Sequence, residues 1–177
     1  MLDVEQCKLA GVYLIRPRVF EDERGHFKET YHRDKYREIG IDVPFVQDNI
    51  SWSKQHVLRG LHCQRRYPQG KLVQVLVGRV FDVAVDLRPD SPTCGQWEGY
   101  ELSAENHHQL YLPPGLAHGF VVLSEAAAFQ YKCTDLYRPD DETGIVWNDP
   151  DLAIAWPVSA PVLSAKDARL PCWADIR

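Results

Sequence analysis

The sequence predicts an all-β fold, a sandwich or barrel, in one domain of 177 residues. Two observations lead to this prediction. Short segments with alternating apolar and polar side chains recur along the chain, and Gly, Pro, Asn and Asp gather between them. Many short strands separated by turn residues are typical of sandwiches and barrels. Because no repeat, low-complexity segment or linker divides residues 1–177, we expect a single domain.

Alternating side chains predict the first strands, and a short helix follows them. Residues 11–20 form a strand interrupted at Pro17, because proline cannot donate to a sheet ladder. The sequence EDERG at 21–25 predicts a turn, and residues 26–31 alternate again. Residues 33–39 are the first helical candidate, ended by the glycine that follows.

The strand expected at residues 45–52, FVQDNISW, is unusually polar. Gln47, Asp48 and Asn49 are rarely found together in a strand unless they face a ligand or a sheet edge. We therefore expect this strand to border either a site or a free edge.

Residues 72–87 carry the clearest strand pattern. Three valines alternate before the pair Gly78-Arg79, and four apolar residues alternate after it. These residues are Val73, Val75, Val77, Phe81, Val83, Val85 and Leu87. The pattern predicts a β-hairpin. Further short strands are expected at residues 100–102, 110–112, 119–123 and 127–134, and the chain after Tyr137 is expected to be mostly irregular.

Composition excludes several classes of protein. The net charge of −5 argues against a broad nucleic-acid surface, although a local basic pocket is compatible with it. No charged and then apolar leader is visible at the N-terminus, and no apolar run reaches membrane-spanning length. The five cysteines are scattered without a CxxC pair, so we expect reduced thiols, a cytoplasmic location and no disulfide framework.

The stretch 57–71, VLRGLHCQRRYPQGK, holds the first candidate site residues. Arg59 and His62 precede a polar loop that ends at Lys71, where an apolar strand begins. A histidine and two cations at the mouth of a strand pair favour an anionic ligand with one proton to move. The alternative is a polar connection that happens to contain a histidine.

Three further residues have both a structural and a functional interpretation. Tyr131 shares a strand face with its neighbours two residues away, and is either a core tyrosine or a phenol facing a cavity. His118 lies in PPGLAHGF, where it is either an exposed turn residue or a ligand contact. Asp167 follows Ser164 as in a helix cap, and either completes that cap or orients a histidine that acts as a base.

The segment PPGLAHGF also contains the pattern PxGxxH, at residues 113–118, which resembles the second conserved motif of the cupins. This resemblance implies a jelly-roll or double-stranded β-helix barrel with a few short helices. The metal-binding cupin pattern is broken, because Gln64 replaces a histidine and Pro68 and Gln69 occupy the place of the glutamate. We therefore expect no metal.

Eleven ordered blocks across the chain resemble the dTDP-4-dehydrorhamnose 3,5-epimerase family. They include GVYLIRPRVFEDERGHFKETY, FVQDNIS, VLRGLHCQ, QGKLVQV, PPGLAHGF, FQYKCTDLY and LSAKD. Two departures are visible. The loop from His62 to Lys71 is slightly shorter than the family's, and Leu116 stands where the family often has Phe.

The resemblance implies a role for each matching residue. His62 is the base, Asp167 its dyad partner, Tyr131 the acid, and Lys71 stabilises an enolate. The remaining matching residues bind the nucleotide sugar, Tyr137 by stacking on the thymine. These residues are Arg24, Glu29, Gln47, Asp48, Asn49, Arg59, His118, Tyr137, Glu142 and Lys166.

The resemblance also implies an activity and partners. The family epimerises dTDP-4-dehydro-6-deoxy-D-glucose at C3 and C5 without a cofactor. It implies a homodimer whose N-terminal strands cross to the partner, which would place Arg24 and Glu29 at the neighbouring chain's site. Two alternatives stay open: another deoxysugar enzyme on this fold, such as a 3- or 5-monoepimerase or a ketoisomerase, and a non-catalytic nucleotide-sugar-binding cupin.

Overall fold

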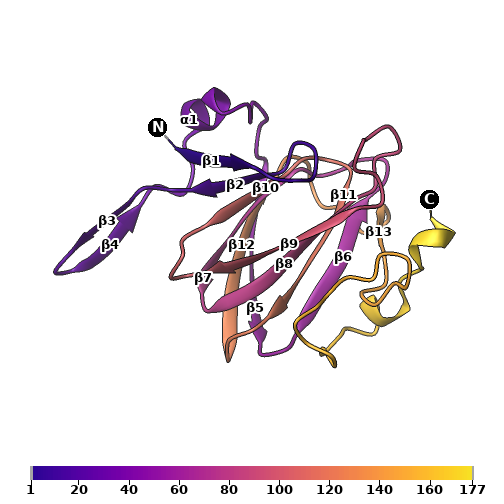
Figure 1. Ribbon diagram of the computed structural model, residues 1–177. Coiled ribbons are helices and arrows are strands. Elements are labelled where there is room, and N and C mark those ends of the chain that lie inside the picture. Colours follow the sequence, from indigo (N-terminus) through magenta and orange to yellow (C-terminus); the bar gives the residue numbers. More distant parts are fainter. Residues whose placement is uncertain (1, 177) are drawn as a thin grey trace.

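The computed structural model describes residues 2–176, and the regular secondary structure of these residues is almost entirely β-strand (Figure 1). The all-β prediction is confirmed. The strands of the described residues are β1 (Asp3–Gln6), β2 (Tyr13–Arg16), β3 (Val19–Asp22), β4 (Gly25–Lys28), β5 (Gln47–Lys54), β6 (Leu58–Gln64), β7 (Lys71–Val77), β8 (Arg79–Asp86), β9 (Trp97–Ser103), β10 (Gln109–Leu112), β11 (Leu116–Val122), β12 (Ala126–Cys133) and β13 (Glu142–Gly144). The helices are α1 (Arg33–Glu38) and two 3₁₀ turns, η1 (Asp167–Arg169) and η2 (Trp173–Asp175).

Two antiparallel sheets face each other. The first has the order β1-β2-β10-β7-β12-β5 and the second the order β13-β6-β11-β8-β9. Side chains from both sheets fill the space between them, with Val73 and Phe129 from the first sheet packing with Val80 and Phe120 from the second. Because alternate residues of a strand point to opposite faces, the apolar alternation seen in the sequence builds this interior.

The predicted hairpin at residues 72–87 is wrong. Both strands exist and both are tightly linked at Gly78, but β7 pairs with β10 and β12, whereas β8 pairs with β11 and β9. Gly78 has a φ of 77°, and a Cβ there would lie 2.1 Å from the carbonyl oxygen of Ala126. The chain therefore turns a corner from one sheet into the other, which strand periodicity alone does not distinguish from a hairpin.

Both outer faces of the sandwich are partly covered. Tyr36 of α1 packs with Ile15, Leu72 and Tyr111 against the first sheet. The irregular C-terminal segment covers the second sheet, where Ile145 and Leu152 pack on Val83 and Val85. The expected helix at 33–39 is confirmed and is followed by Gly40 at a φ of 90°.

Strands β3 and β4 form a two-stranded ribbon that extends away from the sandwich (Figure 1). Phe20 and Phe27 on this ribbon are 51% and 68% exposed. The ribbon therefore presents apolar surface that its own chain leaves uncovered.

One loop at the end of the second sheet is held by a buried carboxylate. Asp86, at the end of β8, accepts hydrogen bonds from the side chains of Arg88, Ser91 and Thr93. The connection from β8 to β9 is thereby fixed by a single side chain.

Across residues 2–176, we find no helix with the length and apolar character needed to cross a membrane.

Candidate active site

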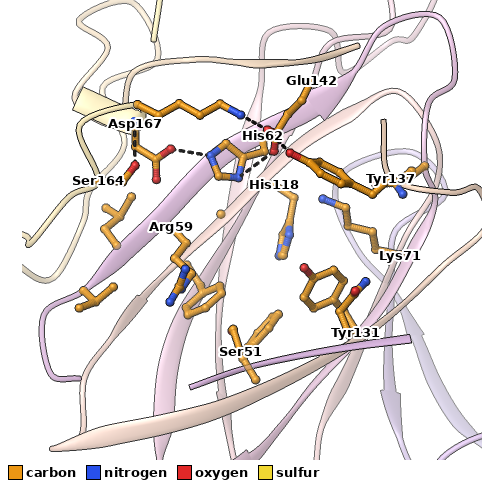
Figure 2. A pocket seen from close by; sticks show the side chains of 18 of the residues that line it. Ser51, Arg59, His62, Lys71, His118, Tyr131, Tyr137, Glu142, Ser164 and Asp167 are labelled. Carbon is orange, nitrogen blue, oxygen red and sulfur yellow. Dashed lines mark hydrogen bonds and ion pairs between the residues drawn. The ribbon is translucent and has the colours of Figure 1, made fainter. Parts of the chain in front are cut away.

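A cavity of about 580 Å³ lies between the sheets, and strands of both sheets contribute to its walls (Figure 2). Its lining includes eleven of the fourteen residues expected at the site. These are Gln47, Asn49, Arg59, His62, Lys71, His118, Tyr131, Tyr137, Glu142, Lys166 and Asp167.

His62 on β6 forms the first chemical feature of the cavity. Its Nε2 lies 2.7 Å from Oδ1 of Asp167, whose side chain is 6% exposed. Ser164 accepts a hydrogen bond from the Asp167 backbone N–H, so this aspartate sits in a capped turn and also contacts the histidine. Burial alone would raise the pKa of Asp167, but hydrogen bonds from His62, Gly60 and Ser164 outweigh it and lower the pKa. Asp167 is thus a carboxylate that fixes the imidazole and leaves Nδ1 facing the cavity (Figure 2).

Tyr131 and Lys71 form the second feature, on the opposing sheet. Tyr131 shares its face of β12 with Phe129 and Cys133, and it lines the cavity together with them. Burial raises the pKa of the Tyr131 phenol, so the phenol is protonated at neutral pH. Burial also lowers the pKa of Lys71, which the neighbouring Cys133, Cys63 and Asp82 partly oppose. The cavity therefore has an imidazole on one wall and a phenol and an amine on the other.

His118 is buried within β11 and is not an exposed turn residue. It is the direct cross-strand partner of His62, and its Nε2 lies 2.8 Å from Oδ2 of Asp82. Burial lowers the pKa of His118 in spite of that carboxylate. A neutral ring whose Nε2–H is held by Asp82 presents Nδ1 as a hydrogen-bond acceptor.

Three side chains gather at the rim, next to His62. Oε2 of Glu142 accepts a hydrogen bond of 2.9 Å from the Tyr137 hydroxyl and pairs with the Lys166 amine. The other Glu142 oxygen lies 3.8 Å from Nδ1 of His62. Arg59 also lines the cavity, and its Nε donates to Ser53 Oγ.

Gly60 allows the strands that carry these groups to approach closely. It has a φ of 120°, and a Cβ there would lie 2.5 Å from Cα of Gly119 on β11. The sequence RGLH therefore brings His62 against the strand that holds His118.

Three expected site residues lie outside the cavity of their own chain. Asp48 occupies the opposite face of β5 from Gln47 and Asn49, where it pairs with Lys132. Arg24 lies at the end of the β3–β4 ribbon and pairs with Asp22, while Glu29 pairs with Lys35. Strand alternation explains the position of Asp48, because residues 47 and 49 share a face of β5 and residue 48 does not.

Sequence reasoning missed Asp82 and Ser51. Asp82 is fully buried, and its Oδ1 has no hydrogen-bond partner among the described residues. Its signal was present, because an acid stands among Val80 and Ala84 on the inward face of β8. Ser51 follows Gln47 and Asn49 on the inward face of β5 and also lines the cavity.

The donor set does not form a metal centre. Within residues 2–176, no group of three or more His, Cys, Asp or Glu side chains is placed to hold a metal ion. The titratable groups that line the cavity include an imidazole, a phenol and an amine, from His62, Tyr131 and Lys71.

Comparisons with known proteins identify the family of this chain. The family model described as dTDP-4-dehydrorhamnose 3,5-epimerase matches residues 6–175. Enzymes of that name from Salmonella typhimurium and Pseudomonas aeruginosa are 55% and 57% identical, over 97% and 94% of this chain and 95% and 93% of theirs.

A solved structure extends the similarity to the fold. The dTDP-6-deoxy-D-glucose-3,5-epimerase from Legionella pneumophila, in complex with dTDP-4-keto-L-rhamnose, aligns with a TM-score of 0.97 at 49% identity. The alignment covers 100% of this chain and 95% of that one. It confirms the prediction of a cupin-type jelly roll. This chain belongs to the dTDP-4-dehydrorhamnose 3,5-epimerase family.

Proposed function

We propose that the cavity is the active site in which this chain epimerises dTDP-4-dehydro-6-deoxy-D-glucose at C3 and C5 to dTDP-4-dehydro-L-rhamnose. One observation carries the proposal. The His62–Asp167 pair and Tyr131 come from opposite sheets and line one cavity, so a sugar ring between them has a base on one face and an acid on the other.

The C4 ketone makes this arrangement effective. It acidifies the hydrogens on C3 and C5, because the carbanion formed at either carbon is delocalised onto O4 as an enolate. His62 Nδ1 removes the proton, and the Asp167 carboxylate stabilises the resulting imidazolium. Tyr131 then delivers its proton to the opposite face, which inverts the carbon.

Lys71 stabilises the enolate in this proposal. It lines the cavity on the same side as Tyr131, where its ammonium can face the negative charge that develops on O4. Its lowered pKa makes it a stronger proton donor to that oxygen. Fixed donors of this kind contribute roughly 3–4 kcal/mol of transition-state stabilisation.

Residues of the cavity and its rim suit the nucleotide. Arg59 in the cavity and Lys166 at the rim provide two cations for the diphosphate, and the half-exposed ring of Tyr137 provides a stacking surface for the thymine. No redox step occurs in the reaction, so these residues complete the set without a nicotinamide or flavin.

We also propose a homodimer. The ribbon exposes Phe20 and Phe27, and the free edge strand β5 exposes Ile50 and Trp52 at 64% and 62%. Exposed aromatic and aliphatic side chains of this number favour a protein–protein interface. Burying the ribbon against a second chain would account for Arg24, which lies outside its own cavity. Light scattering after size exclusion should give twice the monomer mass; a monomer would exclude this arrangement.

The cysteines support a reducing compartment. All five are free thiols. Free thiols persist in the cytoplasm, and we propose that the enzyme works there.

The activity is tested by incubating the protein with dTDP-4-keto-6-deoxyglucose in deuterated water and analysing the sugar by NMR. Deuterium and inversion at both C3 and C5 are expected. Label and inversion at one carbon only would identify a monoepimerase. No exchange by a folded protein that still binds dTDP would identify a binding protein.

A further inference from the structure

The proposed reaction uses one imidazole twice, and this sets a requirement on the site. After the first inversion His62 is an imidazolium and Tyr131 is a phenolate. Both groups are then in the wrong protonation state for the second carbon. His62 must lose its proton, and Tyr131 must regain one from water, before the second inversion. A path for the proton from His62 to solvent is therefore needed.

The Nε2 side of His62 does not provide this path. Asp167 holds Nε2 at 2.7 Å, and its side chain is only 6% exposed. The second Asp167 oxygen accepts the backbone N–H of Gly60. Because the Asp167 side chain is almost completely buried, a proton passed to it would not reach solvent directly.

The Nδ1 side faces a second carboxylate. Glu142 Oε1 lies 3.8 Å from Nδ1 of His62. Strand register produces this contact, because β13 pairs with β6 so that Gly144 opposes His62 and Glu142 opposes Gln64. Residues two apart share a face, which makes Glu142 a diagonal neighbour of His62. Gly144 permits the pairing, since a Cβ there would lie 1.9 Å from the carbonyl oxygen of Leu61.

Glu142 also connects to the surface. Its side chain is 12% exposed, whereas that of its partner Lys166 is 51% exposed. The Tyr137 hydroxyl donates to the same Glu142 oxygen as Lys166 does. Figure 2 shows the Glu142 carboxylate next to His62 and the Tyr137 hydroxyl. The carboxylate thus reaches from the buried imidazole to groups that contact solvent.

We propose that Glu142 accepts the proton from Nδ1 of His62 between the two inversions and releases it to solvent water at the rim. In this step the Nδ1–H bond breaks and an Oε1–H bond forms, and Glu142 then loses the proton to water. The neutral imidazole and the carboxylate are both restored. This inference rests on the proposed function. Glu142 acts through His62 and does not contact the reacting carbons, so it is a positioning residue that resets the protonation state of the base.

The test is Glu142→Gln in deuterated water with enzyme in excess over substrate, following C3 and C5 separately. The amide keeps the shape of the side chain but cannot accept the proton. Exchange at the first carbon serves as the reference rate, because any loss of substrate binding slows both carbons alike. Inversion at the second carbon should slow by about tenfold or more relative to that reference, so that singly inverted sugar accumulates. Added formate, a small carboxylate, should restore the second inversion.

Two control variants separate proton relay from binding. Lys166→Met removes the ion pair and keeps the carboxylate, so KM should rise while the ratio of doubly to singly inverted product stays unchanged. Glu101→Gln makes the same chemical change at an exposed residue of β9 that pairs with Arg79, and both rates should match the wild type.

The relay is overturned if Glu142→Gln slows both carbons equally and formate restores neither, because Glu142 would then only bind substrate. It is also overturned if the variant forms the doubly inverted sugar at the wild-type rate. Should Glu142→Gln fail to fold, Glu142→Ala titrated with formate gives the same comparison. A wild-type protein that exchanges neither carbon would instead refute the proposed function.

Discussion

Two histidine–aspartate pairs face each other across paired strands, and they differ in access rather than in geometry. The nitrogen-to-oxygen distances are 2.7 Å for His62–Asp167 and 2.8 Å for His118–Asp82. The His62 side chain is 26% exposed, whereas that of His118 is 7% exposed and Asp82 is fully buried. A short contact to a carboxylate therefore does not identify a base. The pair that can also exchange its proton with substrate and solvent is the candidate.

The charged groups around the two histidines also differ. Burial lowers the pKa of His118, with Asp82 opposing the shift and the nearby Lys71 and His62 adding to it. We therefore interpret His118 as a neutral hydrogen-bonding residue. His62 has a carboxylate on each side, which suits a group that gains and loses a proton in each cycle.

The largest expected difference between the two pairs is the effect of replacing each histidine separately. We expect His62→Ala to lower kcat by about 10³-fold while dTDP binding persists, because no other described group occupies its position. His118→Asn should lower kcat much less. Steady-state kinetics and dTDP titration measure both. An equal loss in the two variants would contradict the distinction between the pairs.

Tyr131→Phe tests the wall opposite His62. Without the phenol, His62 can still remove and return a proton on its own face, so deuterium exchange should continue while inversion falls by about 10²-fold. NMR of the recovered sugar distinguishes the two. Normal inversion by this variant would require another acid.

The two aspartates should differ in what they stabilise. Asp167→Asn is expected to lower kcat by about 10²-fold with a small change in stability, because the amide cannot support the imidazolium. Asp82→Ala should lower the free energy of unfolding by about 1–3 kcal/mol, because it leaves a buried imidazole unpaired. Urea unfolding and kinetics on both variants provide the measurement. The reverse pattern would assign the catalytic pair to His118.

A smaller effect is expected in the pH dependence of stability. The pKa of His118 is lowered by folding, so the unfolded chain binds more protons as the pH falls below about 6.5. The stability associated with a neutral His118 is present above that pH and is lost as the pH falls toward the folded pKa. The free energy of unfolding of the wild type should therefore decrease from pH 7 to pH 5 more steeply than that of His118→Gln. Parallel profiles would show that His118 does not contribute.

Chelation should have no effect on turnover. Within residues 2–176, no group of three or more His, Cys, Asp or Glu side chains is placed to hold a metal ion. Activity should be unchanged after treatment with a chelator and desalting. Loss of activity that is restored by a divalent ion would contradict a mechanism based on side chains alone.

The sequence predicts the strands well and their pairing poorly. Alternation located β7, β8 and β12 because a residue's face depends only on its neighbours in the chain. The pairing of β7 with β10 and β12 depends on residues 35 to 62 positions away, from Gln74 with Gln109 to Lys71 with Cys133, and alternation does not contain that information.

The same distinction applies to the site. The roles of His62, Lys71, Tyr131 and Asp167 were expected through family resemblance, and the structure brings these four residues to one cavity. Asp82 was missed because its function depends on the strand opposite it. The proximity of Glu142 to His62 depends on the β13–β6 register, which no local pattern predicts.

The corner at Gly78 has a consequence for the order of folding. Because β7 and β8 do not pair with each other, most strand pairs of the two facing sheets form only after long loops close, which slows folding. The β8–β9 pair is the exception in the second sheet, because its connection is short and is held by Asp86. We expect the β8–β9 pair to form early and to nucleate folding. The two sheets that line the cavity would then pack against each other last.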